Sequence, residues 1–237
     1  MSKEDVLNYI KNTTTASITG NANHYQFNTN ANSLILLSKE CYERLTQLTN
    51  LSAFRVDEHN TFLFGLELNP NTIYFYAPDT SRDYEPHHTE VSYGEQQSRE
   101  ITQAINNHSD NKPLVVCGLH THPYGVLKNP DGSPSLQNNF FSYGDLDVSI
   151  KFHTILNNHA QEQGKHIRTF AGLIAIDNAN GNSLISFIEN VNNVSFCRFN
   201  NVKVVEKMPN GQFVVIKDLH ENGLDYIETN FGMDKKS

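Results

Sequence analysis

The chain has few cysteines, no long apolar segment and no excess of basic residues. Its three cysteines lie far apart among 237 residues and form no Cys-x-x-Cys pair, which argues against a disulfide scaffold or a cysteine-based zinc knuckle. No apolar run approaches the roughly 18 residues that a membrane span needs. The first residues, Met1-Ser-Lys-Glu-Asp, also lack the apolar stretch of a secretory signal.

The charge balance is acidic. Eighteen Lys and Arg residues stand against 26 Asp and Glu residues, for a formal net charge of −8. Because binding to phosphate backbones and anionic lipids depends on basic patches, we expect neither nucleic acid nor a membrane as a partner. Hydrophobic residues make up 38% of the chain, which is enough for a packed core. We expect a cytoplasmic globular protein, with an effector delivered by a non-classical route as the alternative; the oligomeric state stays open.

The hydrophobic pattern divides the chain into a central domain and two extensions. A segment rich in Thr, Asn and Gly precedes the first apolar run, so we expect an N-terminal extension or linker over residues 1–31. The domain is expected over 32–190, and a β-rich extension over 191–237 is expected to pack on it.

Strands and helices alternate irregularly along the domain. The patterns predict helices over 38–48, 95–107 and 142–162, hairpins over 61–77 and 168–189, strands over 33–37 and 112–119, and shorter strands near 194–199, 202–205 and 212–216. The chain contains no glycine-rich phosphate loop. The expected fold class is α+β, or mixed α/β, as opposed to a doubly wound nucleotide fold.

Two histidines stand where a buried strand ends, in Gly118-Leu-His-Thr-His-Pro123. Because side chains on a strand alternate with period two, His120 and His122 are expected on one face. Downstream, Ser142-Tyr-Gly-Asp145 places Asp145 in the first turn of a predicted helix. Two imidazoles and one carboxylate, with a fourth position left for water, form the ligand set of a catalytic zinc site. We therefore predict Zn2+ bound by His120, His122 and Asp145.

Hydrolysis at such a site needs two further groups. Zinc lowers the pKa of its water to about 7, and a carboxylate must then carry the proton to the leaving amine. A hydroxyl or amide donor must stabilise the oxyanion. Ser142 lies one helical turn before Asp145, where we expect it to be that donor.

His-Thr-His-Pro followed by Ser-x-x-Asp resembles the motif of the JAMM (MPN+, JAB) metalloproteases, in which a Glu lies upstream. The order of expected elements over about residues 33–190 is similar to that of a JAMM domain. The resemblance implies a central curved mixed β-sheet flanked by helices. It also implies hydrolysis of a peptide or isopeptide bond, with a conjugate of ubiquitin or of a ubiquitin-like modifier as the suspected protein substrate.

The segment between the two halves of the motif is longer than is usual in the family. Residues 124–141 intervene, and we interpret them as a lid or a substrate-binding insertion. An alternative motif, Ser135-Leu-Gln-Asn138, lies closer to the usual distance, but Asn is a poorer zinc ligand than Asp.

The position of the general base also departs from the family pattern. Three residues before Gly65, where the Glu usually lies, the chain has Phe62. Glu58, at the start of this strand and of the same parity, resembles the Glu of RadC-like members. We predict Glu58 as the general base, with Glu67, which a regular strand points to the opposite face, as the alternative.

Other readings of these residues stay open. An MPN-like domain with an impaired site can act as a scaffold or binding module in a larger assembly, and the displaced Glu leaves this alternative in place. Ser142 and Asp145 also fit the start of a helix, where they mimic a capping box. We interpret His87-His88, among acidic residues, as part of a polar surface loop and not as a second metal site.

Overall fold

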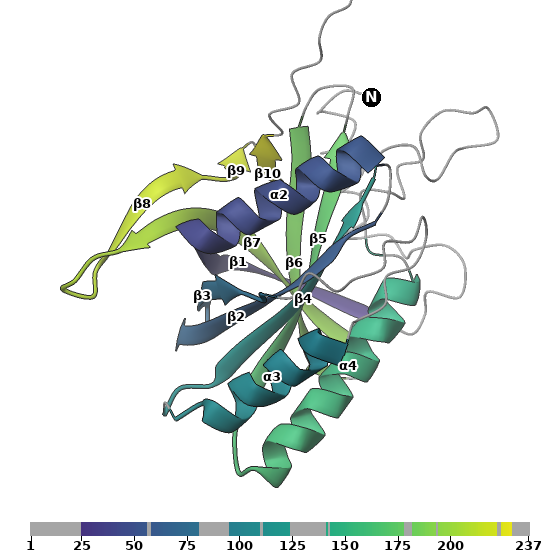
Figure 1. The fold of residues 1–237 in the computed structure, drawn as a ribbon, viewed down its shortest axis with the longest axis vertical. Helices are drawn as coiled ribbons and strands as arrows, with labels where there is room; N and C mark the ends of the chain where they lie inside the picture. The colour runs from purple at the N-terminus through teal and green to yellow at the C-terminus, as the bar shows by residue number, and fades with distance from the viewer. Residues whose placement is uncertain are drawn as a thin grey trace, which may run out of the picture.

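The computed structural model describes residues 25–55, 58–80, 95–109, 111–123, 141, 143–177, 182–192, 194–221 and 224–228. These residues form three helices and ten strands (Figure 1). In chain order they are β1 (Gln26–Ser38), α2 (Lys39–Arg55), β2 (Asn60–Asn69), β3 (Thr72–Pro78), α3 (Glu95–Asn107), β4 (Leu114–His122), α4 (Tyr143–Glu162), β5 (Ile167–Asp177), β6 (Asn182–Asn192), β7 (Ser195–Lys207), β8 (Phe213–Asp218), β9 (His220–Glu221) and β10 (Leu224–Glu228).

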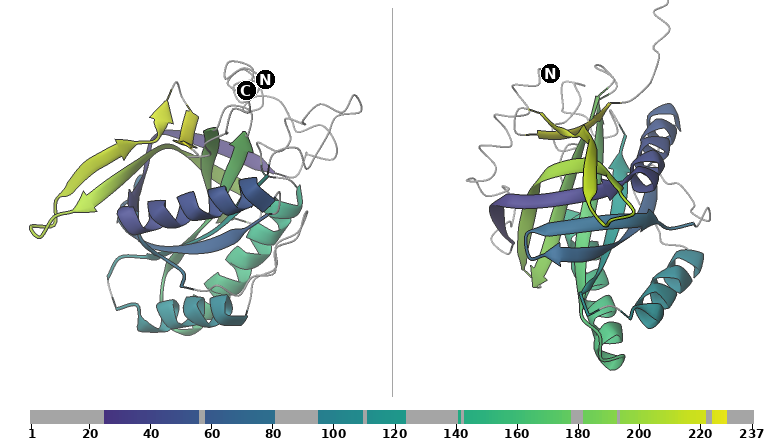
Figure 2. Two further views of the ribbon diagram at one scale, coloured as in Figure 1. Left: turned by 45° about the horizontal axis from the view of Figure 1, so that its top comes forward. Right: turned by 90° about the vertical axis from the view of Figure 1, so that its left-hand side faces the viewer.

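All ten strands belong to one mixed sheet that curls on itself. Its order is β8-β7-β1-β3-β2-β4-β5-β6-β10-β9, and β6 also pairs with β7. This extra pairing joins the strands from β7 to β6 into a ring, with β1–β3, β1–β7 and β4–β5 parallel. The β7–β8 hairpin projects from the ring (Figure 2). The prediction of a mixed α and β fold with a curved mixed sheet and flanking helices is therefore confirmed.

The concave side of the sheet holds the main hydrophobic core. Aromatic side chains from four different strands meet there, namely Phe75, Phe170, Phe187 and Phe199. Helix α2 contributes Cys41 and Leu45 to the same core. Ser38 caps its start, because the Ser38 hydroxyl accepts a hydrogen bond from the Cys41 N–H at 3.1 Å.

The other two helices cover the outer face of β2 and β4 (Figure 1). Ile101 and Ile105 of α3 and Leu156 of α4 pack there against Phe62 and Val116. None of the described helices is long and apolar enough to cross a membrane.

Several elements differ from those predicted, and tertiary pairing explains each difference. β1 begins at Gln26 inside a polar segment that we expected as linker, because residues 26–30 pair with Ser195–Phe199 of β7. β7 is one continuous strand inside the ring, where we expected two short strands in an extension. Residues 1–24 of the expected extension, His87-His88, and residues 124–140 of the expected insertion fall outside the described residues.

Candidate metal centre

The alternation of β4 places the two histidines on the outer face of the sheet. Val115, Cys117 and Leu119 belong to the inner core, whereas Leu114 and Val116 face α3 and α4. His120 and His122 continue the outer row and come under the start of α4, as the period of two predicted. Their side chains retain only 15% and 9% of their exposure.

Asp145 comes to the same point from the first turn of α4. Its Oδ1 lies 3.3 Å from His120 Nε2 and its Oδ2 lies 3.5 Å from His122 Nε2. The two Nε2 atoms are 3.1 Å apart. The structure therefore brings the three predicted ligands together, and their ligand atoms form a group that could hold a metal ion.

The start of α4 is anchored to β6 and β7 by packing and by hydrogen bonds. Leu146 is buried in a small core with Ile188 and Phe196. The Asn190 side-chain amide donates hydrogen bonds to the Ser149 hydroxyl at 2.7 Å and to its carbonyl at 3.2 Å. Asp145 is thus held by packed neighbours on a regular helix, which is the kind of support that a precise ligand geometry needs.

The electrostatics of the centre favour an ionised Asp145. Burial raises the pKa of this carboxyl. Hydrogen bonds and charge interactions with His120 and His122 lower it and together outweigh burial, so the pKa lies well below its usual range. The imidazole nitrogens, in turn, face each other and a carboxylate. Without a proton on one nitrogen or a bound cation, these lone pairs would repel one another.

Glu58 lies beside this centre, half-buried, at the start of the β2 segment. Asn60 pairs with His120 across the β2–β4 ladder, and the Thr121 N–H donates to the His59 carbonyl at 2.9 Å. Burial raises the pKa of Glu58, His122 and His120 lower it, and Asp145 raises it, with a net upward shift. Glu58 is therefore close enough to sense all three candidate ligands.

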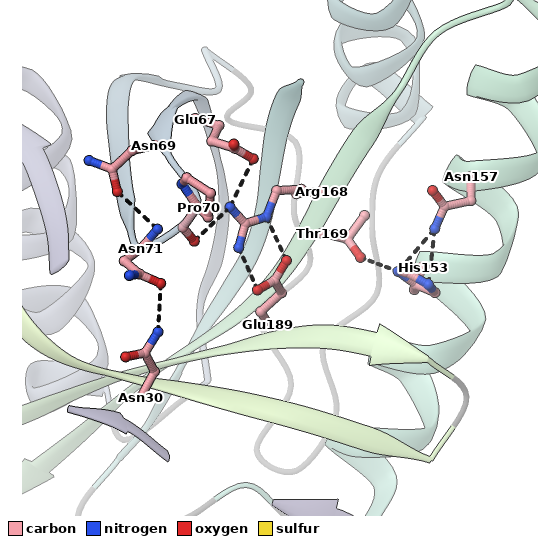
Figure 3. A network of polar contacts seen from close by, with 10 residues as sticks. All are labelled: Asn30, Glu67, Asn69, Pro70, Asn71, His153, Asn157, Arg168, Thr169 and Glu189. Carbon is pink, nitrogen blue, oxygen red and sulfur yellow. Dashed lines mark hydrogen bonds and ion pairs between the residues drawn. The ribbon is translucent and has the colours of Figure 1, made fainter. Parts of the chain in front are cut away.

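Glu67, the alternative base, lies at the opposite end of the β2–β4 pairing and is already engaged. Seven positions separate Glu67 from Asn60, which is roughly 23 Å along a strand. Its carboxylate lies 3.0 Å from Arg168, whose guanidinium also binds both carboxylate oxygens of Glu189 at 2.6 Å (Figure 3). The structure therefore does not bring Glu67 to the histidines.

Two aromatic residues border the centre. The Phe141 ring meets the His120 ring edge-on with centroids 6.2 Å apart. The Tyr25 hydroxyl donates a hydrogen bond to Asp147, two residues after Asp145. Ser142, the predicted oxyanion donor, falls outside the described residues, so its role stays a prediction.

Sequence reasoning missed the polar residues that surround the histidines. The Thr121 hydroxyl is bonded to His59 and Ser52 behind β4, and Asn60 stands next to His120 on the outer face. The parity of β2 was a signal for Asn60, since it lies two residues from Glu58 on the same side. No sequence pattern pointed to the partners of Thr121.

The chain was also compared with known proteins. A scan against models of protein families found no match, and a search of curated proteins found none either.

Proposed function

We propose that the protein is a zinc-dependent hydrolase of the JAMM type that cuts a peptide or isopeptide bond. The observation that carries the proposal is the convergence of three ligand side chains on one point. Ligands of tetrahedral zinc lie about 2.0–2.2 Å from the metal, so neighbouring ligand atoms are about 3.3–3.5 Å apart. The closest approaches are 3.1 Å between the Nε2 atoms of His120 and His122, 3.3 Å from His120 Nε2 to Asp145 Oδ1, and 3.5 Å from His122 Nε2 to Asp145 Oδ2. One ligand atom from each residue lies within 4.8 Å of the other two. The residues present therefore fit a zinc ion at this point.

The chemistry divides between the metal and the chain. A bound zinc ion would supply Lewis acidity and lower the pKa of water to about 7. Glu58 takes the proton of the attacking water and delivers it to the leaving nitrogen, so that one amide bond and one water become a carboxylic acid and an amine. Half-burial and an upward-shifted pKa suit a carboxyl that must both accept and donate a proton.

The substrate class comes from the resemblance of the sequence motif. It implies a protein conjugate, with ubiquitin or a ubiquitin-like modifier as the first to test. The curled mixed sheet with α4 over β4 is compatible with a JAMM/MPN-type domain. Ser142, immediately before α4, remains the proposed donor to the oxyanion.

The test combines metal analysis with a hydrolysis panel. Purified wild type is expected to carry one zinc ion per chain and to cleave at least one substrate in a panel of ubiquitin–aminomethylcoumarin, linked di-ubiquitins and ubiquitin-like conjugates. Glu58→Gln is expected to keep the zinc and to lose about 10²–10⁴-fold in kcat, the usual contribution of a general base.

Glu67→Gln is the matched control, because it makes the same substitution on the same strand segment outside the centre. We expect it to retain both zinc and hydrolysis per folded molecule. Full activity in Glu58→Gln would remove Glu58 from its role. Wild type that binds no zinc and cleaves nothing in the panel would contradict the hydrolase proposal and favour a scaffold.

A further inference from the structure

Thr121, between the two histidines, points away from the metal centre. Its side chain lies on the inner side of β4 and is completely buried. Its Oγ1 accepts a hydrogen bond from the His59 backbone N–H at 2.9 Å and donates one to Ser52 Oγ in α2 at 2.8 Å. The Thr121 N–H donates to the His59 carbonyl, also at 2.9 Å. Thr121 is therefore tied to the backbone of His59 through both its hydroxyl and its amide.

These contacts affect the position of Glu58 because Glu58 lies just beyond the end of the β2–β4 ladder. The regular register of β2 against β4 runs from Leu66 opposite Leu114 to Asn60 opposite His120, and Glu58 precedes this last pair by two residues. The bonds between Thr121 and His59 extend the pairing one residue further, to the neighbour of Glu58. The direction of the Glu58 side chain thus depends on how firmly His59 is held.

The same strand end is fixed by a separate buried network around Asp79. The Gln97 side chain donates to Asn60 Oδ1 at 3.2 Å and to Asp79 Oδ2 at 2.9 Å. The Thr61 hydroxyl donates to the other oxygen of Asp79. This network binds Asn60 directly to α3 and Thr61 to α3 through Asp79. The inner-face contact at His59 is made by Thr121.

We propose that Thr121 is a positioning residue whose hydroxyl holds the His59 backbone and so directs the Glu58 carboxylate toward the scissile bond. This inference rests on the proposed function, since Glu58 matters only if the centre hydrolyses a bond. It gives the His-Thr-His segment two faces with separate tasks. The histidines bind the metal on the outer face of the sheet, and the threonine positions the general base from the inner face.

Thr121→Val tests the proposal because it keeps the shape of the side chain and removes the hydrogen bonds of the hydroxyl. We expect one zinc ion per chain, as in wild type, with kcat on ubiquitin–aminomethylcoumarin, or on whichever panel substrate wild type cleaves, lower by about 10²-fold and KM unchanged. Amide hydrogen exchange, measured without metal, should be faster at His59. Thr121→Ser restores the hydroxyl and is expected to restore kcat and exchange protection. Thr121→Cys, a weaker acceptor, should fall between them.

Thr49→Val is the matched control. Thr49 is equally buried. Among the described residues, its hydroxyl donates a hydrogen bond only within α2, to the Leu45 carbonyl at 2.8 Å. It should leave zinc, kcat and His59 exchange unchanged. Thr121→Val with wild-type kcat and His59 protection would overturn the proposal, and so would loss of zinc together with activity. If wild type neither binds zinc nor cleaves, the proposed function fails, and the exchange rates alone then decide whether Thr121 holds His59.

Discussion

Two charged clusters lie at opposite ends of the β2–β4 pairing, and they differ in how their charges are matched. In the first, Arg168 stands between Glu67 and Glu189 and also donates to the Pro70 carbonyl at 3.2 Å (Figure 3). Each carboxylate there faces a permanent cation at 3.0 Å or less. The second cluster brings His120, His122 and Asp145 to one point.

The difference separates a cluster whose charges are matched internally from one that could hold a metal ion. A guanidinium remains charged at any relevant pH and satisfies carboxylates with fixed geometry. A neutral imidazole carries no positive charge. With neutral histidines, the second cluster therefore brings imidazole nitrogens and a carboxylate together without a cation of its own. A cluster of this kind is completed by a proton or by a metal ion, whereas the Arg168 cluster needs neither.

The largest effect is expected from Asp145→Asn, which removes the charged ligand. Loss of second-shell partners alone lowers metal affinity by about 10–100-fold, so loss of a ligand should exceed about 100-fold. Zinc affinity is measured by competition with a chelating dye, and hydrolysis should fall to background. Asp147→Asn, on the same helical turn, is the control and should bind zinc as wild type does. Equal affinity in the two variants would remove Asp145 from the ligand set.

Arg168→Met should have the opposite profile. It leaves Glu67 and Glu189 largely buried without their cation, which costs about 3 kcal/mol in the free energy of unfolding. Zinc affinity of the folded protein should stay unchanged because the clusters lie at different ends of the strands. Urea denaturation and dye competition measure the two quantities, with Arg99→Met on the surface of α3 as the control. A large drop in zinc affinity would show that the clusters are coupled.

Local patterns were sufficient to predict the segments that carry the candidate site. The strand period placed His120 and His122 on one face, and the helix start placed Asp145 opposite them, because both rules act over a few residues. The opposite orientation expected for Glu67 also agrees with its engagement by Arg168. The roles of these residues in metal binding and hydrolysis remain predictions.

The closure of the sheet could not be predicted from such patterns. It depends on β7, which pairs with β6 and also with β1, where Gln26–Asn30 lie parallel to Ser195–Phe199, segments far apart in the chain. The first of these is polar, and its strand conformation comes from the hydrogen bonds and packing of its partner, since local propensity does not favour it. Phe27, for example, stacks on Phe196 with centroids 5.3 Å apart. For the same reason the buried contacts of Thr121 with Ser52 and His59 had no signature in the sequence.

Zinc itself should stabilise only proteins with an intact second cluster. A ligand that binds the folded state alone adds about 2.7 kcal/mol at a free concentration of about 100 times its Kd. Wild type and Arg168→Met should gain this amount equally in urea denaturation with buffered zinc. Asp145→Asn should gain nothing at the same free zinc. Equal stabilisation of all three proteins would place the bound zinc elsewhere.

The smallest effect concerns His153, which lies on α4 beside Thr169 and Asn157 (Figure 3). Burial lowers the pKa of His153, and the charge of Glu189 partly opposes this shift. As the pH falls through the ordinary imidazole pKa of about 6.5, His153 therefore takes up its proton in the unfolded chain before it does so in the folded chain. The resulting loss of stability below that range should be absent from His153→Gln, which keeps a hydrogen-bonding group for Thr169.

The measurement is the free energy of unfolding of both proteins in the presence of a chelator, from about pH 7 to about pH 5, the range over which an ordinary imidazole titrates. All other groups are common to wild type and variant, so the difference between the two proteins isolates His153. Wild type should lose more stability than His153→Gln as the pH falls. Parallel curves would show that His153 has the same pKa in the folded and unfolded chains.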